Sequence, residues 1–168
     1  PGTHGYDCQV HLADVNHSSL LCTTSEGEGE NLYMELNVSG RTTPWKQNAF
    51  SYLRPSISIL SRDTSPTSAL EDKGNGAQRI LVTAQGANFG PADRFSNTRI
   101  VVDCKNPDGN GPSKHCRDGR LAVLNHTMSG WKKNHTHLSF HVPEGYGQLL
   151  QLKVIVGGSP SNEVAFSY

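Results

Sequence analysis

The chain has 168 residues, enough for one domain or for a domain and a fraction. Its 15 basic and 15 acidic residues cancel, so nothing in the charge favours a polyanion and we expect no nucleic-acid partner. Hydrophobic residues make up only 35% while glycine and proline are plentiful, which is typical of a loop-rich β domain with a thin core.

The predicted elements are short β-strands. Apolar and polar residues alternate at 32–38 and again at 150–156, which is the two-residue period of a half-buried strand. Further strands are predicted at 49–52, 77–84, 99–103, 120–124, 135–142 and 164–168. Glycine and proline separate these runs, and no stretch has a convincing helical period. The pattern predicts an all-β protein of the β-sandwich type.

Two stretches between the strands look like insertions. Residues 61–76 are polar and rich in turn formers, so we expect a flexible loop over the surface. Residues 105–119 are equally rich in turn residues, and a bond between the cysteines at 104 and 116 would staple them. No apolar run reaches the roughly 20 residues that cross a bilayer, so we expect no direct membrane insertion.

Four cysteines, Cys8, Cys22, Cys104 and Cys116, fall into two locally spaced pairs. Four cysteines allow three connectivities, which the sequence does not distinguish, and bonding within each local pair is the simplest. Their spacing does not resemble the short Cys-x-x-Cys hooks of zinc sites. We therefore predict two disulfides within the chain.

Four acceptor sequences for N-linked glycans occur, at Asn16, Asn37, Asn125 and Asn134. About one would be expected by chance in a chain of this length. Together with the paired cysteines, they favour the secretory pathway and an extracellular or cell-surface location. A cytosolic protein with idle acceptors and free thiols is the alternative.

The sequence also repeats itself. The run 25–40 resembles the run 143–158, and each leads to the tripeptide Phe-Ser-Tyr, at 50–52 and at 166–168. The alignment pairs Gly27 with Gly145, Gly29 with Gly147, Leu32 with Leu150, Met34 with Leu152, Leu36 with Val154 and Val38 with Val156. A repeat of domain length is typical of tandem arrays, which favours spacing, adhesion and binding over catalysis.

Four motifs, in chain order, resemble the IPT/TIG family of immunoglobulin-like domains. They are Pro-x-Ile at 55–57, Gly-x-Asn-Phe-Gly at 86–90, Pro-x-Gly-x-Gly at 143–147 and Phe-x-Tyr at 166–168. The resemblance implies an immunoglobulin-like β-sandwich of the kind used in receptor ectodomains and surface stalks. It also implies that Cys8 and Cys22 form an inter-strand pair, whereas Phe140 stands at the place of Cys22 in the second copy.

The resemblance divides the chain into tandem repeats, one partial and one complete. Residues 53–168 resemble a complete IPT/TIG-like domain with insertions at 61–76 and 105–119, and residues 1–52 resemble the C-terminal part of a preceding domain. Because Pro1 is not a natural start, we expect a piece of a longer chain. The join through Leu53 and Arg54 has almost no linker, which predicts a restricted angle between the two units.

We expect no enzyme and no cofactor, because no motif for nucleophilic, metal or phosphate chemistry is found. His135, His137 and His141 share one face of a predicted strand and are weak candidates for metal ligands, with a solvated polar face as the favoured alternative. Asp103 and the loop residues Asp108 and Asn110 could offer oxygens to calcium but match no known calcium repeat.

We therefore expect a non-catalytic structural and adhesion module of an extracellular or cell-surface array, acting by spacing and protein–protein contact. Its partners would be neighbouring repeats or other protein chains, in a filament or surface assembly, and N-linked glycans. The alternatives are a ligand-binding receptor ectodomain fragment that uses the two insertions, an accessory domain of a larger secreted enzyme, and a nuclear DNA-binding IPT/TIG domain. The neutral charge balance argues against the last.

Overall fold

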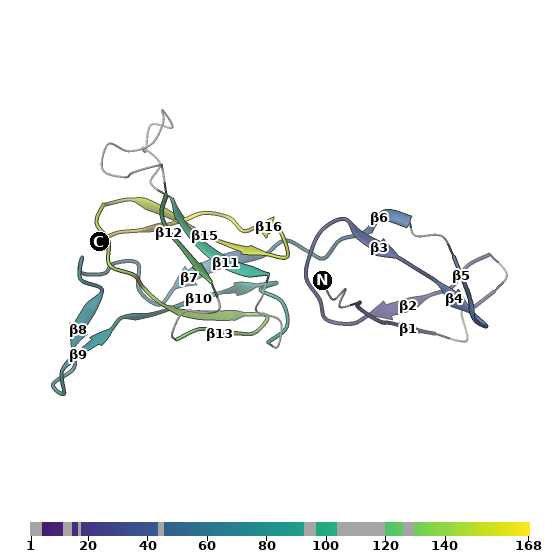
Figure 1. Ribbon diagram of the computed structural model, residues 1–168, viewed down its shortest axis with the longest axis horizontal. Helices are drawn as coiled ribbons and strands as arrows, with labels where there is room; N and C mark the ends of the chain where they lie inside the picture. The colour runs from purple at the N-terminus through teal and green to yellow at the C-terminus, as the bar shows by residue number, and fades with distance from the viewer. Residues whose placement is uncertain are drawn as a thin grey trace, which may run out of the picture.

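The computed structural model describes residues 5–11, 15–16, 18–43, 46–92, 97–103, 120–125 and 130–168. These residues form strands and turns, and no helix among them is long and apolar enough to cross a membrane. The strands fall into two units along the long axis of the molecule, β1 to β6 and β7 to β17 (Figure 1). The prediction of an all-β protein is confirmed for the described residues.

In the second unit, the described strands form two antiparallel sheets around one core and a separate hairpin. The first sheet has the order β13 (Lys132–Lys133), β14 (His137–His141), β10 (Leu81–Ala87) and β7 (Ser56–Leu60). The second sheet has the order β12 (Arg120–Asn125), β11 (Thr98–Asp103), β15 (Leu150–Val156) and β16 (Ser159–Pro160), and β17 (Val164–Phe166) also pairs with β15. A hairpin of β8 (Leu70–Asp72) and β9 (Ala77–Arg79) projects at the end that carries the C-terminus (Figure 1).

Alternating apolar side chains build the core of the second unit. In β15, Leu150, Leu152, Val154 and Val156 are buried while the residues between them are half-buried, so the strand predicted at 150–156 is confirmed. The first sheet contributes buried residues such as Val82, Ala84, Leu138 and Phe140 to the same cluster. Full burial of a large aliphatic or aromatic side chain contributes about 1.5–3 kcal/mol, so this cluster is the main source of folding free energy here.

The first unit contributes no described residue to that core cluster, whose members all lie between Ile57 and Phe166. Its described residues form three two-stranded antiparallel pairs: β1 (Cys8–Val10) with β2 (Cys22–Thr24), β3 (Leu32–Met34) with β6 (Lys46–Phe50), and β4 (Asn37–Val38) with β5 (Arg41–Thr42). The strand predicted to run through 32–38 is broken between β3 and β4, and Met34 and Val38 are 49% and 58% exposed. The prediction of half-burial is wrong for these two side chains. β3 and β4 each pair with one short strand, and no second sheet among the described residues covers their apolar side as the first sheet covers β15.

The polar segment 61–76 is more ordered than its composition predicts. Thr64 forms a parallel bridge with Ser167, the backbone N–H of Ser65 donates to the Ser167 carbonyl over 2.9 Å, and Ala69 is buried. The segment lies on the surface as expected, with only Ser65 and Ala69 buried in it, but these contacts tie it to the end of β17 before β8 begins. Buried Ile80 then separates β9 from β10, so the strand predicted at 77–84 is split. The insertion at 105–119 lies outside the described residues.

Candidate functional site: the joint between the two units

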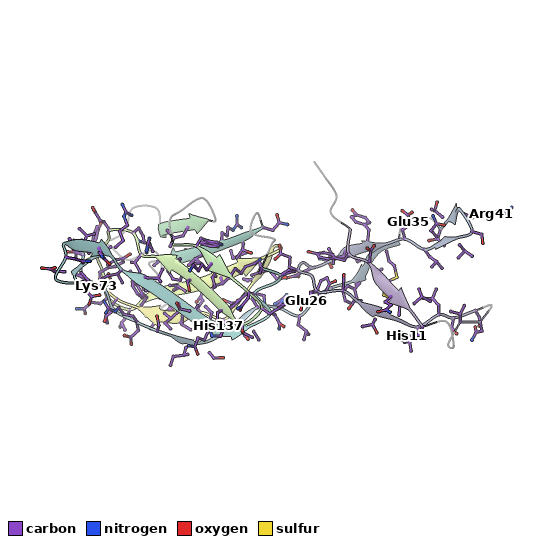
Figure 2. All side chains as sticks on the ribbon, turned by 90° about the horizontal axis from the view of Figure 1, so that it is seen from below. His11, Glu26, Glu35, Arg41, Lys73 and His137 are labelled. Atoms are coloured by element: carbon purple, nitrogen blue, oxygen red, sulfur yellow. A yellow bond between two sulfur atoms is a disulfide. The ribbon has the colours of Figure 1, made fainter. Side chains whose placement is uncertain are left out.

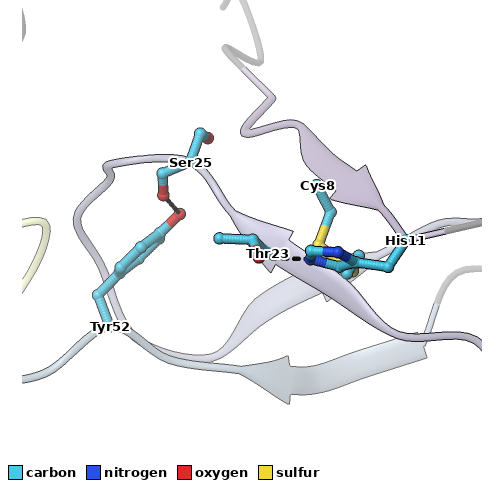
Figure 3. The surroundings of a disulfide bond; sticks show 6 residues. Cys8, His11, Thr23, Ser25 and Tyr52 are labelled. Atoms are coloured by element: carbon cyan, nitrogen blue, oxygen red, sulfur yellow. Dashed lines mark hydrogen bonds between the residues drawn. A yellow bond between two sulfur atoms is a disulfide. The ribbon is translucent and has the colours of Figure 1, made fainter. Parts of the chain in front are cut away.

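The first predicted disulfide is confirmed. Cys8 and Cys22 are bonded, with their Cα atoms 5.6 Å apart on the paired strands β1 and β2 (Figure 3). A hydrogen bond of 2.7 Å between Nε2 of His11 and Oγ1 of Thr23 lies beside it. Cys104 and Cys116 lie outside the described residues, so the second disulfide stays a prediction.

Two of the predicted glycan acceptors form the same local structure. Oδ1 of Asn16 accepts hydrogen bonds from the backbone N–H and the hydroxyl of Ser18, at 2.9 and 3.0 Å. Oδ1 of Asn134 accepts the equivalent bonds from Thr136, at 2.9 and 3.2 Å. Both asparagines are exposed. Each of these two acceptors thus sits in an Asx turn on the surface.

The third acceptor, Asn37, is exposed on β4, where its Oδ1 accepts the backbone N–H of Gly40 at 3.0 Å. Ser39 and Gly40 both have positive φ, at 51° and 81°, as the two-residue turn of a tight hairpin requires. The side chain of Asn125, at the end of β12, lies outside the described residues.

The three histidines that were weak metal candidates do not form a cluster. His135 precedes β14, and its Nε2 lies 3.2 Å from a carboxylate oxygen of Glu26 in the first unit. His137, at the start of β14, is hydrogen-bonded through Nδ1 to the hydroxyl of Thr136, and the ring of His141 lies over Gly130. Among the residues that the structure describes, no three His, Cys, Asp or Glu side chains are placed to hold a metal ion.

The calcium candidate Asp103 is engaged by a lysine. Its Oδ2 accepts a hydrogen bond of 2.6 Å from Nζ of Lys153, which lies 3.4 Å from Glu163 as well. The hydrogen bond to Asp103 raises the pKa of the Lys153 ammonium group above its ordinary value, against the opposing effect of burial. Asp108 and Asn110 lie outside the described residues.

The residues with the most unusual environment lie where the two units meet, and we call this contact the joint. It is formed by residues 26–30 of the first unit and by Gly90, Thr98, Lys133 and Gly157 of the second. Figure 2 shows Glu26 at the narrow waist between the two units. The waist is a place of close packing, because residues 27–29 are all buried.

An ion pair closes the joint. Nζ of Lys133 donates to Oε2 of Glu28 over 2.9 Å, and the two side chains are only 0% and 2% exposed. The same ammonium group donates to the hydroxyl of Thr98 over 2.8 Å. The other carboxylate oxygen of Glu28 is buried without a hydrogen bond from the described residues, so the carboxylate depends on Lys133 for its compensation.

Two glycines make room for this contact. A Cβ at Gly90 would collide with Oε2 of Glu28 and lie 3.2 Å from Nζ of Lys133, and Gly90 also has a positive φ of 82°. A Cβ at Gly157 would lie 2.6 Å from the backbone of Gly29. The two units therefore meet backbone against backbone, at a distance that only glycine allows.

Contacts at the rim complete the joint. The hydroxyl of Ser159 donates to Oε1 of Glu30 over 2.5 Å, and the same carboxylate lies 3.7 Å from the guanidinium of Arg54. The Arg54 carbonyl accepts a hydrogen bond of 3.0 Å from the side chain of Asn88. The short connection between the units, residues 53–55, is thus fixed to both of them.

Sequence reasoning did not find the ion pair. Glu28 falls in a recognised repeat, and Lys133 is half of a dibasic pair, but their separation in the chain gives no signal that they meet. One signal was present in the sequence. The repeat aligns Glu28 with Tyr146, so the first copy has a charged side chain where the second copy has an aromatic one.

The sequence matches no protein-family model and no curated protein.

Proposed function

We propose that this chain is a non-catalytic structural and adhesion module of an extracellular or cell-surface protein, and that it holds neighbouring β units at a set angle. One observation carries the proposal: the joint buries an ion pair whose two members come from different units. Such a pair costs desolvation and adds little net stability, but it is satisfied in one arrangement only. A mobile linker would not need it.

The proposal includes the IPT/TIG likeness and the tandem division into a partial unit, 1–52, and a complete unit, 53–168. The two copies of the Phe-Ser-Tyr tripeptide support it. The rings of Phe50 and Tyr52 meet edge to face at 4.9 Å, and those of Phe166 and Tyr168 at 5.3 Å. The two pairs of aromatic residues therefore end their units in the same way.

An extracellular setting is supported by the Cys8–Cys22 disulfide, which would be reduced in the cytosol. The exposed acceptors at Asn16, Asn37 and Asn134 suit N-linked glycans. The proposed partners are neighbouring repeats and other protein chains.

The test removes one half of the ion pair. Lys133→Met leaves the carboxylate of Glu28 buried without its cation, at a cost of about 3–5 kcal/mol that opening the joint would relieve. In the native protein, NMR relaxation should give both units the same rotational correlation time. In Lys133→Met the two units should tumble separately, and adding Glu28→Met should restore common tumbling because both charges are then gone.

Glu71→Gln is the matched control, since Glu71 pairs with Arg62 at 3.1 Å on the surface of the second unit. It removes one acidic charge away from the joint and should leave the tumbling unchanged. Separate tumbling of the units in the native protein would contradict the proposed function.

A further inference from the structure

The turn that enters the joint has a structural counterpart at the other end of the molecule. The backbone N–H of Tyr52 donates to the Gly29 carbonyl over 2.9 Å, and that of Tyr168 donates to the Gly147 carbonyl over 2.7 Å. The hydroxyl of Tyr52 donates to the Ser25 carbonyl over 2.9 Å, as that of Tyr168 does to the Pro143 carbonyl over 2.9 Å. The turns 25–31 and 143–149 therefore share these two bonds to the closing tyrosine.

The backbone conformation of the two turns matches as well. Gly29 and Gly147 have φ values of 115° and 126°, and Asn31 and Leu149 both have 54°. The N–H of each residue at the 54° position donates to the serine hydroxyl of the following Phe-Ser-Tyr tripeptide, at 2.9 and 3.1 Å. The match therefore includes the position of Asn31 and Leu149 as well as that of the two glycines.

The two turns differ in what covers them. Glu28 is buried against Lys133 and Gly90 of the second unit, and Gly29 against Gly157. Gly27 is buried against the ring of Tyr52 in its own unit. In the counterpart, Gly145 and Gly147 are half-buried, and Tyr146 and Leu149 are 54% and 55% exposed. The turn 143–149 thus presents the shape that docks in the joint. The described chain contacts it at Gly145, through the Thr67 carbonyl, and leaves Tyr146 and Leu149 exposed.

We infer that the turn 143–149 is a second docking face, and that its partner is the entry end of another β-sandwich unit following in the same longer protein. The inference rests on the proposed function, and names a partner for it. The entry end is the part that this chain presents at Gly90, Thr98, Lys133 and Gly157. Continuity with the joint supports the assignment, because the same turn geometry is already docked on such an end once in this chain.

The residue at the centre of each turn, Glu28 or Tyr146, determines which unit can dock on that turn. Glu28 requires a cation opposite it, whereas Tyr146 at the same place offers a ring and one hydroxyl. A buried ammonium group facing the phenol would lose its carboxylate, and the larger ring needs more space than the glutamate. The partner therefore has small residues at the places of Gly90 and Gly157 and no cation at the place of Lys133.

One contact at the rim of the joint can also form with the proposed partner. Gln148 aligns with Glu30 in the repeat, and its amide oxygen can accept a hydrogen bond from the residue that corresponds to Ser159, whose hydroxyl donates to Glu30 in the joint. The β8–β9 hairpin projects at this same end of the molecule (Figure 1), and the backbone of Thr67 accepts the N–H of Gly145 over 3.0 Å. The partner would be received beside this hairpin.

The test extends the native chain. Residues 53–168 are appended directly after Tyr168, which recreates the Phe-Ser-Tyr-Leu-Arg-Pro join, and Gln148→Asn in the appended copy marks its peptides by mass. Three versions of this extended protein are compared by amide hydrogen exchange. The first has no further substitution, the second has Lys133→Ala in the appended copy, and the third has Tyr146→Glu in the first copy.

We expect residues 143–149 of the first copy to exchange about tenfold more slowly than in the 168-residue protein in two versions, Lys133→Ala and Tyr146→Glu. The Lys133→Ala substitution removes the cation from the place that Tyr146 would enter, and the Tyr146→Glu substitution restores the glutamate–lysine pair of the native joint. The version without a further substitution, in which Tyr146 of the first copy would face Lys133 of the appended copy, should show no such slowing.

The inference is overturned if Tyr146→Glu gives no protection, because the turn is then not a docking face. It is also overturned if Lys133→Ala gives none, or if the unchanged version is protected equally, because Tyr146 then does not select the partner. Residues 26–31 report on the native joint in every version. If they too exchange rapidly, the proposed function fails as well, so the two failures are distinguishable.

Discussion

A single leucine occupies a backbone conformation that suits it poorly. Leu149 has a φ of 54°, in the left-handed region where a side chain crowds its own backbone, and it is 55% exposed, so packing gives it little in return. Its counterpart in the first unit is Asn31, with the same φ. Asparagine tolerates this conformation because its short side chain can hydrogen-bond locally.

Leu149→Asn is therefore expected to raise the free energy of unfolding by about 1 kcal/mol. The midpoint of urea unfolding, at an unchanged slope, measures the gain. Gln148→Asn is the matched control, since it changes an exposed neighbour in the same turn and should leave the midpoint within error. A midpoint that falls in Leu149→Asn would show that the leucine is not strained.

For single residues, the sequence predicted the Cys8–Cys22 disulfide and the exposed asparagines, but it did not predict the buried ion pair. Cys8 and Cys22 were recognisable because cysteines are few and locally spaced, and the exposed asparagines because their acceptor motif is short. Glu28 and Lys133 meet only through the packing of two units, which no local pattern encodes. Sequence alone could not separate this buried glutamate from its exposed neighbour Glu26.

The strands of the two units show how far one pattern depends on its surroundings. The alternation in β15 buries every second side chain because β11 pairs with residues 151–156 and the opposing sheet covers the apolar side of the strand. The same alternation in the first unit yields two short strands with exposed Met34 and Val38. Periodicity predicts which face is apolar, but only the neighbouring strands decide whether that face is buried.

The elements of the first unit should therefore depend strongly on the disulfide. The bond closes a loop with a sequence separation of 14, for which chain entropy gives about 3 kcal/mol. In a Cys8→Ser/Cys22→Ser variant, the amides of β1 and β2 should exchange faster by one to two orders of magnitude, while β10, β11 and β15 keep their protection.

Hydrogen exchange measured on both proteins at one pH checks this expectation. A substitution that leaves cysteines in place, Thr23→Ser on β2, keeps the disulfide and should keep the protection. Loss of protection in β11 and β15 together with β1 would mean that the two units unfold as one, and that the core of the second unit depends on the first.

The molecule as a whole should lose stability at alkaline pH. Burial raises the pKa of Tyr168 to about 12, and the hydrogen bond to Asp103 raises the pKa of Lys153. The unfolded values are about 10.0 for tyrosine and 10.4 for lysine. Because both folded values are higher, both contributions are complete below about pH 10 and are lost as the pH rises through the folded values.

The free energy of unfolding from urea titrations should accordingly be flat from about pH 8 to pH 10 and fall between about pH 10 and pH 12. Tyr168→Phe should be less stable at pH 8, since it loses the bond to the Pro143 carbonyl, but its decline above pH 10 should be shallower. A decline as steep as that of the native protein would show that Tyr168 is not the group that titrates.

The packing of Gly29 on Gly157 determines how a row of such units would respond to load. Pulling along the chain is borne by the covalent connection at residues 53–55, whatever the state of the joint. Bending has to separate two backbones in contact and pull Glu28 away from Lys133. The joint therefore adds stiffness against bending and little against extension, so the persistence length of the row would be set by the units and not by their linkers.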